Sequence, residues 1–82
     1  MCKDGINAGQ LTATISQIDD AVTLCRRWTH RTFLQTESDN MLRSAARLRD
    51  AEKLLDQVRA LLKEASELVE KESAVDVSVR LV

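Results

Sequence analysis

An apolar stripe dominates the pattern of hydrophobic and polar positions between residues 38 and 72. Apolar or small residues occupy two positions of a seven-residue repeat, and a row of leucines lies directly beside the first position. This spacing predicts a long helix packed against other helices, because a helix brings residues three, four and seven apart onto one face. The three rows are Met41, Leu48, Leu55, Leu62 and Val69; Ser44, Ala51, Val58 and Ala65; and Leu54, Leu61 and Leu68.

A second helical pattern precedes this stripe and predicts a helix over residues 11–34. Apolar residues recur at spacings of four and three, as expected for one face of an amphipathic helix. Thr12, Thr14 and Ser16 each fit an N-cap, so the first residue of this helix is left open. The stripe consists of Leu11, Ile15, Ile18, Val22 and Cys25, and it is widened by Leu24, Trp28 and Phe33.

The break between the two helices is expected at residues 35–40. Ser38, Asp39 and Asn40 are good cap residues, and a connection of about four residues favours antiparallel neighbours. The chain has no proline, and its two glycines lie within residues 1–10, which predicts a flexible arm there. The sequence therefore predicts an all-α antiparallel hairpin over 11–72, with helices at about 11–34 and 39–72.

In the tail over residues 73–82 the apolar residues no longer follow a seven-residue repeat and instead occupy every second position. Valine and leucine alternate with polar residues, which is typical of a β-strand over 75–81. A single strand cannot stand alone, so it would have to pair with another chain. A disordered tail or a longer helix remains the alternative. The alternating apolar residues are Val75, Val77, Val79 and Leu81.

The two predicted helices differ in length, which favours a homo-oligomer. At 1.5 Å per residue they span about 36 Å and about 50 Å, so the first covers the second only to about Leu62. Ala65, Leu68 and Val69 would then need a second chain, and a two-fold dimer forming a helical bundle is favoured. The predicted oligomer interface comprises Leu48, Leu55, Val58, Leu62, Leu68, Val69, Ile15, Ile18 and Val22.

The net charge is −1, but the charges are unevenly distributed. Residues 26–49 hold six basic and two acidic side chains, whereas residues 50–72 hold four basic and seven acidic ones. In a hairpin the basic segment lies at the connecting end, together with the only large aromatic residues. This basic tip is one candidate site for an anionic partner: nucleic acid phosphates, an acidic protein segment or lipid headgroups. Alternatively, Trp28 and Phe33 only close the end of the bundle.

The side chains expected to bind a partner are those of the basic tip and of the tail. They are Arg26, Arg27, Trp28, Arg31, Arg43 and Arg47 at the tip, and Val75, Val77, Val79 and Leu81 in the tail.

No catalytic or metal-binding constellation is visible in the sequence. His30 is the only histidine, and Cys2 and Cys25 do not have the spacing of metal ligands. We therefore expect no enzyme activity, no cofactor and no metal. Cysteine on a helical apolar face usually acts as a small hydrophobe, which favours reduced thiols and a cytoplasmic location. No apolar run is long enough for a membrane span.

The function that fits these features is that of a non-enzymatic interaction or scaffold module. It would oligomerise through its helical apolar stripes and engage a protein partner with the C-terminal strand or the basic tip. The alternative is a small nucleic-acid-binding regulator that uses the basic tip.

Overall fold

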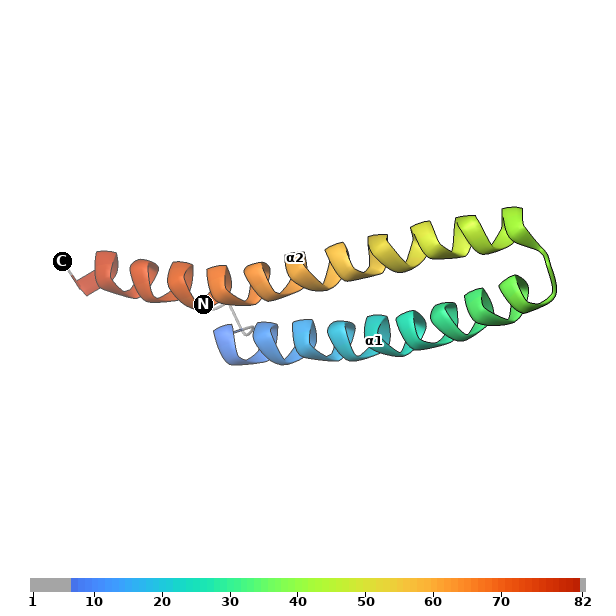
Figure 1. Cartoon of the computed structure of the whole chain (residues 1–82). Helices are drawn as coiled ribbons and strands as arrows, with labels where there is room; N and C mark the ends of the chain where they lie inside the picture. The colour runs from blue at the N-terminus through green and yellow to red at the C-terminus, as the bar shows by residue number, and fades with distance from the viewer. Residues whose placement is uncertain (1–6, 82) are drawn as a thin grey trace.

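The computed structural model describes the backbone of residues 7–81 and the side chains of residues 7–73. Helix α1 (Ala8–Ser38) and helix α2 (Leu42–Leu81) run antiparallel and are joined by a short turn (Figure 1). Helix α2 continues past the first turn of α1, so its C-terminal end projects alone (Figure 1). The predicted all-α helical hairpin is confirmed, with helix bounds that differ from the expected ones.

Helix α1 begins three residues earlier than predicted because Asn7 is its N-cap. The Asn7 side chain accepts a hydrogen bond from the Gln10 N–H at 2.8 Å, and the Gln10 side chain accepts one from the Asn7 N–H. This reciprocal pair satisfies two N–H groups that the first helical turn leaves unpaired. The end of the predicted arm is therefore a cap and a first turn, whereas residues 1–6 lie outside the described residues.

Helix α1 also continues beyond residue 34, where the sequence favoured a break. The threonines near its end do not interrupt it, because their hydroxyl groups donate to carbonyl oxygens within the helix, such as Thr36 Oγ1 to Thr32 O at 3.0 Å. The chain then reverses at Asn40, whose φ of 61° lies in the left-handed region. The Met41 N–H donates to Thr36 O at 2.8 Å and closes the helix end.

The predicted strand over 75–81 is wrong, since α2 runs as one helix to Leu81. No proline or glycine interrupts the chain after Gly9, so nothing in the backbone stops the helix. A lone strand would leave its backbone groups unpaired, whereas a helix satisfies them within the segment. Side chains from residue 74 onward, including those of Val75, Val77, Val79 and Leu81, lie outside the described ones.

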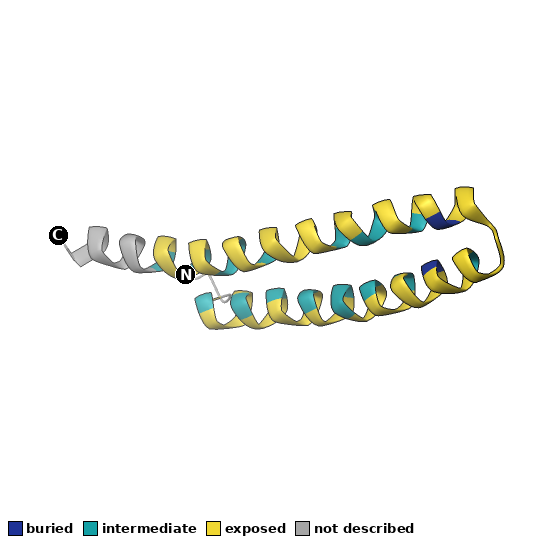
Figure 2. Cartoon of the chain, viewed as in Figure 1, coloured by how far each residue is buried: buried dark blue, intermediate teal, exposed yellow. Residues whose placement is uncertain are grey.

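The two helices meet along one seam whose contacts alternate at spacings of three and four. Only Phe33 and Ala45, near the turn, are buried among the described side chains, at 7% and 4% exposure. The other apolar seam residues are half-buried, as the teal segments on the facing sides of both helices show (Figure 2). They are Ile15 and Val22 from α1 and Leu48, Leu55, Leu62 and Val69 from α2.

The overhang expected beyond Leu62 is not present at those residues. Because α1 starts at Ala8, its first turns lie beside α2 and half-bury Ala65 and Val69. Leu68 is 51% exposed, but it is exposed sideways, on the flank of the hairpin. Among the described side chains, the uncovered apolar surface therefore runs along the hairpin.

The elongated shape leaves an unusually large surface in water. The radius of gyration is 18.6 Å, compared with about 12 Å for a compact domain of this length. The accessible surface is 6423 Å², compared with about 4,900 Å² for a compact monomer of 9.2 kDa. The hairpin therefore lacks a closed core of its own.

We expect Phe33→Ala to destabilise the hairpin by about 3–5 kcal/mol, because it empties the one buried aromatic position. The matched control is Leu34→Ala, on the next residue of the same turn, whose side chain is 48% exposed. It should cost less than about 1 kcal/mol. Urea denaturation followed by circular dichroism measures both, and equal losses would contradict the observed burial.

We expect the turn to tolerate Asn40→Gly and to resist Asn40→Val. Glycine adopts the left-handed φ of 61° without strain, whereas a β-branched residue there costs about 1–2 kcal/mol. Thermal unfolding at a fixed protein concentration compares the two variants. A valine variant as stable as the glycine variant would show that the turn has a different backbone conformation.

Candidate functional site

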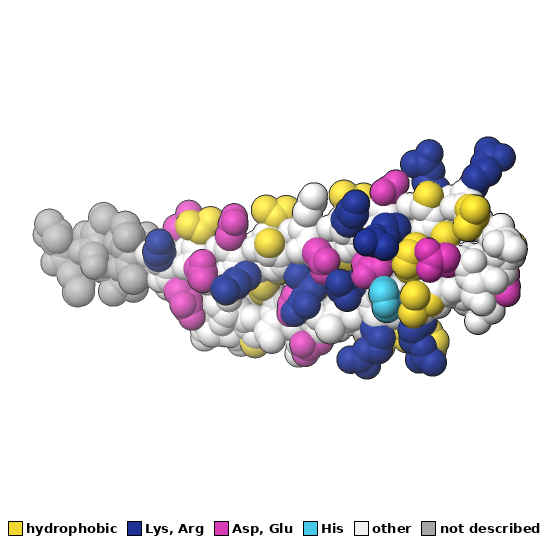
Figure 3. Space-filling model, in the orientation of Figure 1, with side chains coloured by type: hydrophobic (Ala, Val, Ile, Leu, Met, Phe, Trp, Pro, Cys, Tyr) yellow, Lys and Arg dark blue, Asp and Glu magenta, His cyan; other side chains and the backbone are white. Residues whose placement is uncertain are grey.

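The seam divides the hairpin surface into a polar face and an apolar face. In an antiparallel helix pair, equivalent flanking positions of both helices lie on the same side of the seam. On one side these positions hold charged and hydroxyl side chains, visible as mixed dark blue and magenta with the cyan histidine (Figure 3). We call this side the polar face; it consists of Ser16, Thr23 and His30 from α1 and Arg49, Asp56 and Lys63 from α2.

The opposite side, which we call the apolar face, carries two parallel stripes of hydrophobic and small residues. On α2 the exposed fractions reach 59% for Leu54 and 63% for Leu61. On α1 the Trp28 side chain is 56% exposed. The stripes consist of Leu11, Thr14, Ile18, Ala21, Cys25 and Trp28 on α1 and of Ala51, Leu54, Val58, Leu61, Ala65 and Leu68 on α2.

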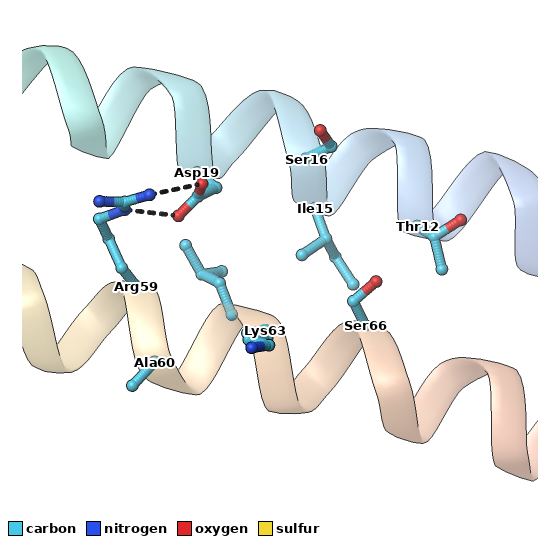
Figure 4. Close-up of a pocket in the computed structure, with 9 residues that line it drawn as sticks. Thr12, Ile15, Ser16, Asp19, Arg59, Ala60, Lys63 and Ser66 are labelled. Atoms are coloured by element: carbon cyan, nitrogen blue, oxygen red, sulfur yellow. Dashed lines mark hydrogen bonds and ion pairs between the residues drawn. The ribbon is translucent and has the colours of Figure 1, made fainter.

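The seam itself contains charged layers between its apolar ones. Arg59 donates from Nε to Asp19 Oδ1 at 3.0 Å, and the pair closes one end of an open groove of about 420 Å³ between the helices (Figure 4). The hydrogen bond from the Arg59 guanidinium to Asp19, and then the charge of that carboxylate, raise the pKa of Arg59 above its ordinary value. Seven residues on, Ser66 faces Thr12 and Ile15 across the same groove.

A second charged layer holds Arg26, which the sequence placed among the partner-binding residues. Its guanidinium lies 3.3 Å from Glu52 and donates through Nε to Asp56. The hydrogen bond to Asp56, followed by the Asp56 charge, raises the pKa of Arg26. His30 Nδ1 also lies 3.2 Å from Glu52, whose side chain is only 13% exposed. Arg26 therefore binds the other helix of its own hairpin.

The remaining arginines of the expected tip do not converge on one surface. Arg27 and Arg31 line one open pocket together with Arg26. Arg43 and Arg47 line a different pocket at the start of α2. Dark blue groups accordingly appear at both the upper and the lower edge near the turn (Figure 3). The Arg31 guanidinium lies 4.9 Å from the centre of the Trp28 ring, as in a cation–π contact. Arg47 is exposed and lies 3.5 Å from Asp50.

The residues predicted for oligomerisation fall into two groups. Ile15, Val22, Leu48, Leu55, Leu62 and Val69 lie in the seam of the hairpin, and Ile18, Val58 and Leu68 lie on the apolar face. The predicted set omits Leu11, Leu54 and Leu61, which also lie on the apolar face. The leucine row at residues 54, 61 and 68 was visible in the sequence. The sequence signal for this face is that the row lies directly beside a second row of Ala51, Val58 and Ala65 on the same helix.

The described residues include no group of three or more His, Cys, Asp or Glu side chains that could hold a metal ion. None of the helices, as far as they are described, is both long and apolar enough to cross a membrane. Cys25 carries an exposed free thiol on the apolar face. The apolar face, with its exposed side chains on both helices, is the candidate functional site.

Comparison of the chain with protein-family models, curated proteins and solved structures gives no match.

We expect Asp19→Asn to lower the urea midpoint at low salt, because it removes one carboxylate from a charged layer of the seam. The side chains of Arg59 and Asp19 are 43% and 31% exposed, so high salt should shrink the loss. Asp20→Asn, on the adjacent exposed position, is the control and should leave the midpoint unchanged. The same loss for both variants would argue against a specific role of this ion pair.

Proposed function

We propose that this chain is a non-enzymatic interaction module whose hairpins associate through their apolar faces into a helical bundle. One observation carries the proposal: exposed large apolar side chains recur along the same side of both helices, while only two described side chains are buried. Exposed apolar patches of this extent mark interaction surfaces. Single exposed leucines are common, but a repeat of seven along two adjacent helices is not.

The available surface supports self-association. The chain exposes about 1,500 Å² more than a compact monomer of its mass, which is about twice the 800 Å² that each partner contributes to a standard interface. In part of the seam, charged layers alternate with apolar ones. Packing of α1 against α2 therefore buries less apolar surface, and stabilises the hairpin less, than packing of two fully apolar helices would. Association would supply the missing core.

In such an assembly the polar face stays in water. The arginines on the outer sides of the helices, Arg27, Arg31 and Arg43, would remain available to a further protein partner, which gives the module a scaffolding role. A nucleic-acid-binding regulator is the alternative. It has less support, because Arg26 is engaged with Glu52 and Asp56 and the other arginines lie on different sides.

We expect Leu61→Glu to abolish self-association, because it places a charge at the centre of the apolar face. In an isolated hairpin this substitution would be nearly neutral, since Leu61 is 63% exposed. Gln57→Glu, one turn earlier on the outer side of α2, is the matched control and should associate like the unmodified chain. Sedimentation at micromolar concentration measures the mass, and circular dichroism verifies that each variant is helical.

An unmodified chain that sediments as a monomer of 9.2 kDa throughout the concentration series would contradict the proposal.

A further inference from the structure

The apolar stripe of α2 is complementary in side-chain size and charge to the same stripe of a second copy that runs in the opposite direction. A basic residue stands at one end and an acidic residue at the other, with small and large apolar residues between them. Successive members are separated alternately by four and three residues, so all lie on one side of the helix. In chain order the stripe reads Arg47, Ala51, Leu54, Val58, Leu61, Ala65, Leu68 and Glu72.

Antiparallel pairing of this stripe with a second copy matches both size and charge. Ala51 would face Leu68 of the partner subunit, and Leu54 would face Ala65 of the partner subunit. At the centre, Val58 would face Leu61 of the partner subunit. Each layer then combines a larger side chain with a smaller one, which is how facing layers of a core fill space evenly.

The charged ends distinguish this arrangement from the parallel one. In the antiparallel alignment, Arg47 of each chain lies over the partner's Glu72. The interface therefore has one such ion pair at each of its two ends. In register and parallel, Arg47 would face the partner's Arg47 and Glu72 the partner's Glu72. Like charges disfavour such an alignment, as they do between helices of a coiled coil. Arg47 is exposed and has only a 3.5 Å contact with Asp50, so it can serve this role.

The α1 stripe can also pair with a reversed copy of itself. The centre of that pairing lies at the same level of the hairpin as the centre of the α2 pairing. The midpoint of the α1 stripe lies between Ile18 and Ala21, and that of the α2 stripe lies between Val58 and Leu61. The ion pair between Asp19 and Arg59 shows that these two midpoints lie side by side. A single two-fold axis can therefore relate both pairs of helices at once. In α1 it would bring Trp28 onto the partner's Leu11.

The charges of the whole hairpin favour the same alignment. The half nearest the turn, residues 26–53, carries seven basic and four acidic side chains. The open half, residues 8–25 and 54–73, carries three basic and seven acidic ones. A dimer with the turns at opposite ends places the basic half of each hairpin over the acidic half of its partner. With the turns at the same end, basic halves would face each other and acidic halves would face each other.

We propose, resting on the self-association inferred above, that two copies pack apolar face to apolar face with their turns at opposite ends. The two-fold axis is perpendicular to the helices at the level of the Asp19–Arg59 pair. Each α2 is antiparallel to the partner's α2, and each Arg47 lies over the partner's Glu72. The second copy thus completes a four-helix bundle.

Charge exchange between the two ends tests this arrangement. Arg47→Glu and Glu72→Arg, made separately, each convert two attractive contacts into repulsive ones and should raise the dissociation constant of the dimer about tenfold at low salt. The double variant restores opposite charges and should return the constant to near its original value. Lys53→Glu, at an exposed position of α2 that is not part of the apolar face, is the control and should have little effect.

Sedimentation equilibrium separates the possible failures. If the unmodified chain is monomeric, self-association itself is excluded. If the unmodified chain is dimeric but the double variant binds no better than the single ones, self-association stands and the antiparallel alignment is overturned.

A cysteine cross-link provides a second test that does not depend on charge. In a Cys2→Ser background, Thr14→Cys places a thiol opposite Cys25 of the partner subunit. Within one chain, positions 14 and 25 are about 16 Å apart along the helix, too far for a disulfide. Oxidation with diamide should therefore give a covalent dimer. Ser16→Cys, on the polar face, is the control; equal cross-linking of both variants would overturn the alignment.

Discussion

The charged layers inside the seam are the constraint on which the rest of the structure depends. Where two apolar helices could have packed tightly, Asp19 faces Arg59, and Arg26 faces Glu52 and Asp56. Partly buried ion pairs fix which residues face each other, but contribute little net stability because each charge loses hydration. The seam therefore sets the register of the hairpin without giving it a full core, and a long row of exposed apolar side chains remains on the apolar face.

This division of roles connects the fold to the proposed function. The seam aligns α1 and α2 so that the centres of their apolar stripes lie at one level, marked by the Asp19–Arg59 pair. The apolar face results, and the charged polar face lies on the other side of the seam. Two packed helices bury little surface, so the proposed second layer of helices would give the hairpin the core that it lacks alone.

Sequence periodicity was sufficient to predict the helical hairpin. It also identified two apolar rows of the second helix, one at residues 48, 55 and 62 and the other at residues 54, 61 and 68. It could not show which rows face α1, because Glu52 and Arg59 read as solvated surface although they belong to the seam. Helix ends depended on the local hydrogen bonds of Asn7, Gln10 and the threonines. The alternation at 75–81 suggested a strand because periodicity ignores the absence of a neighbouring strand.

The fluorescence emission of Trp28 reports whether association covers the apolar face. Trp28 is the only tryptophan and is 56% exposed in the single hairpin. We expect blue-shifted emission at high protein concentration, with a cooperative red shift on dilution as dimers separate. Emission that stays that of a water-exposed indole at every concentration would contradict it.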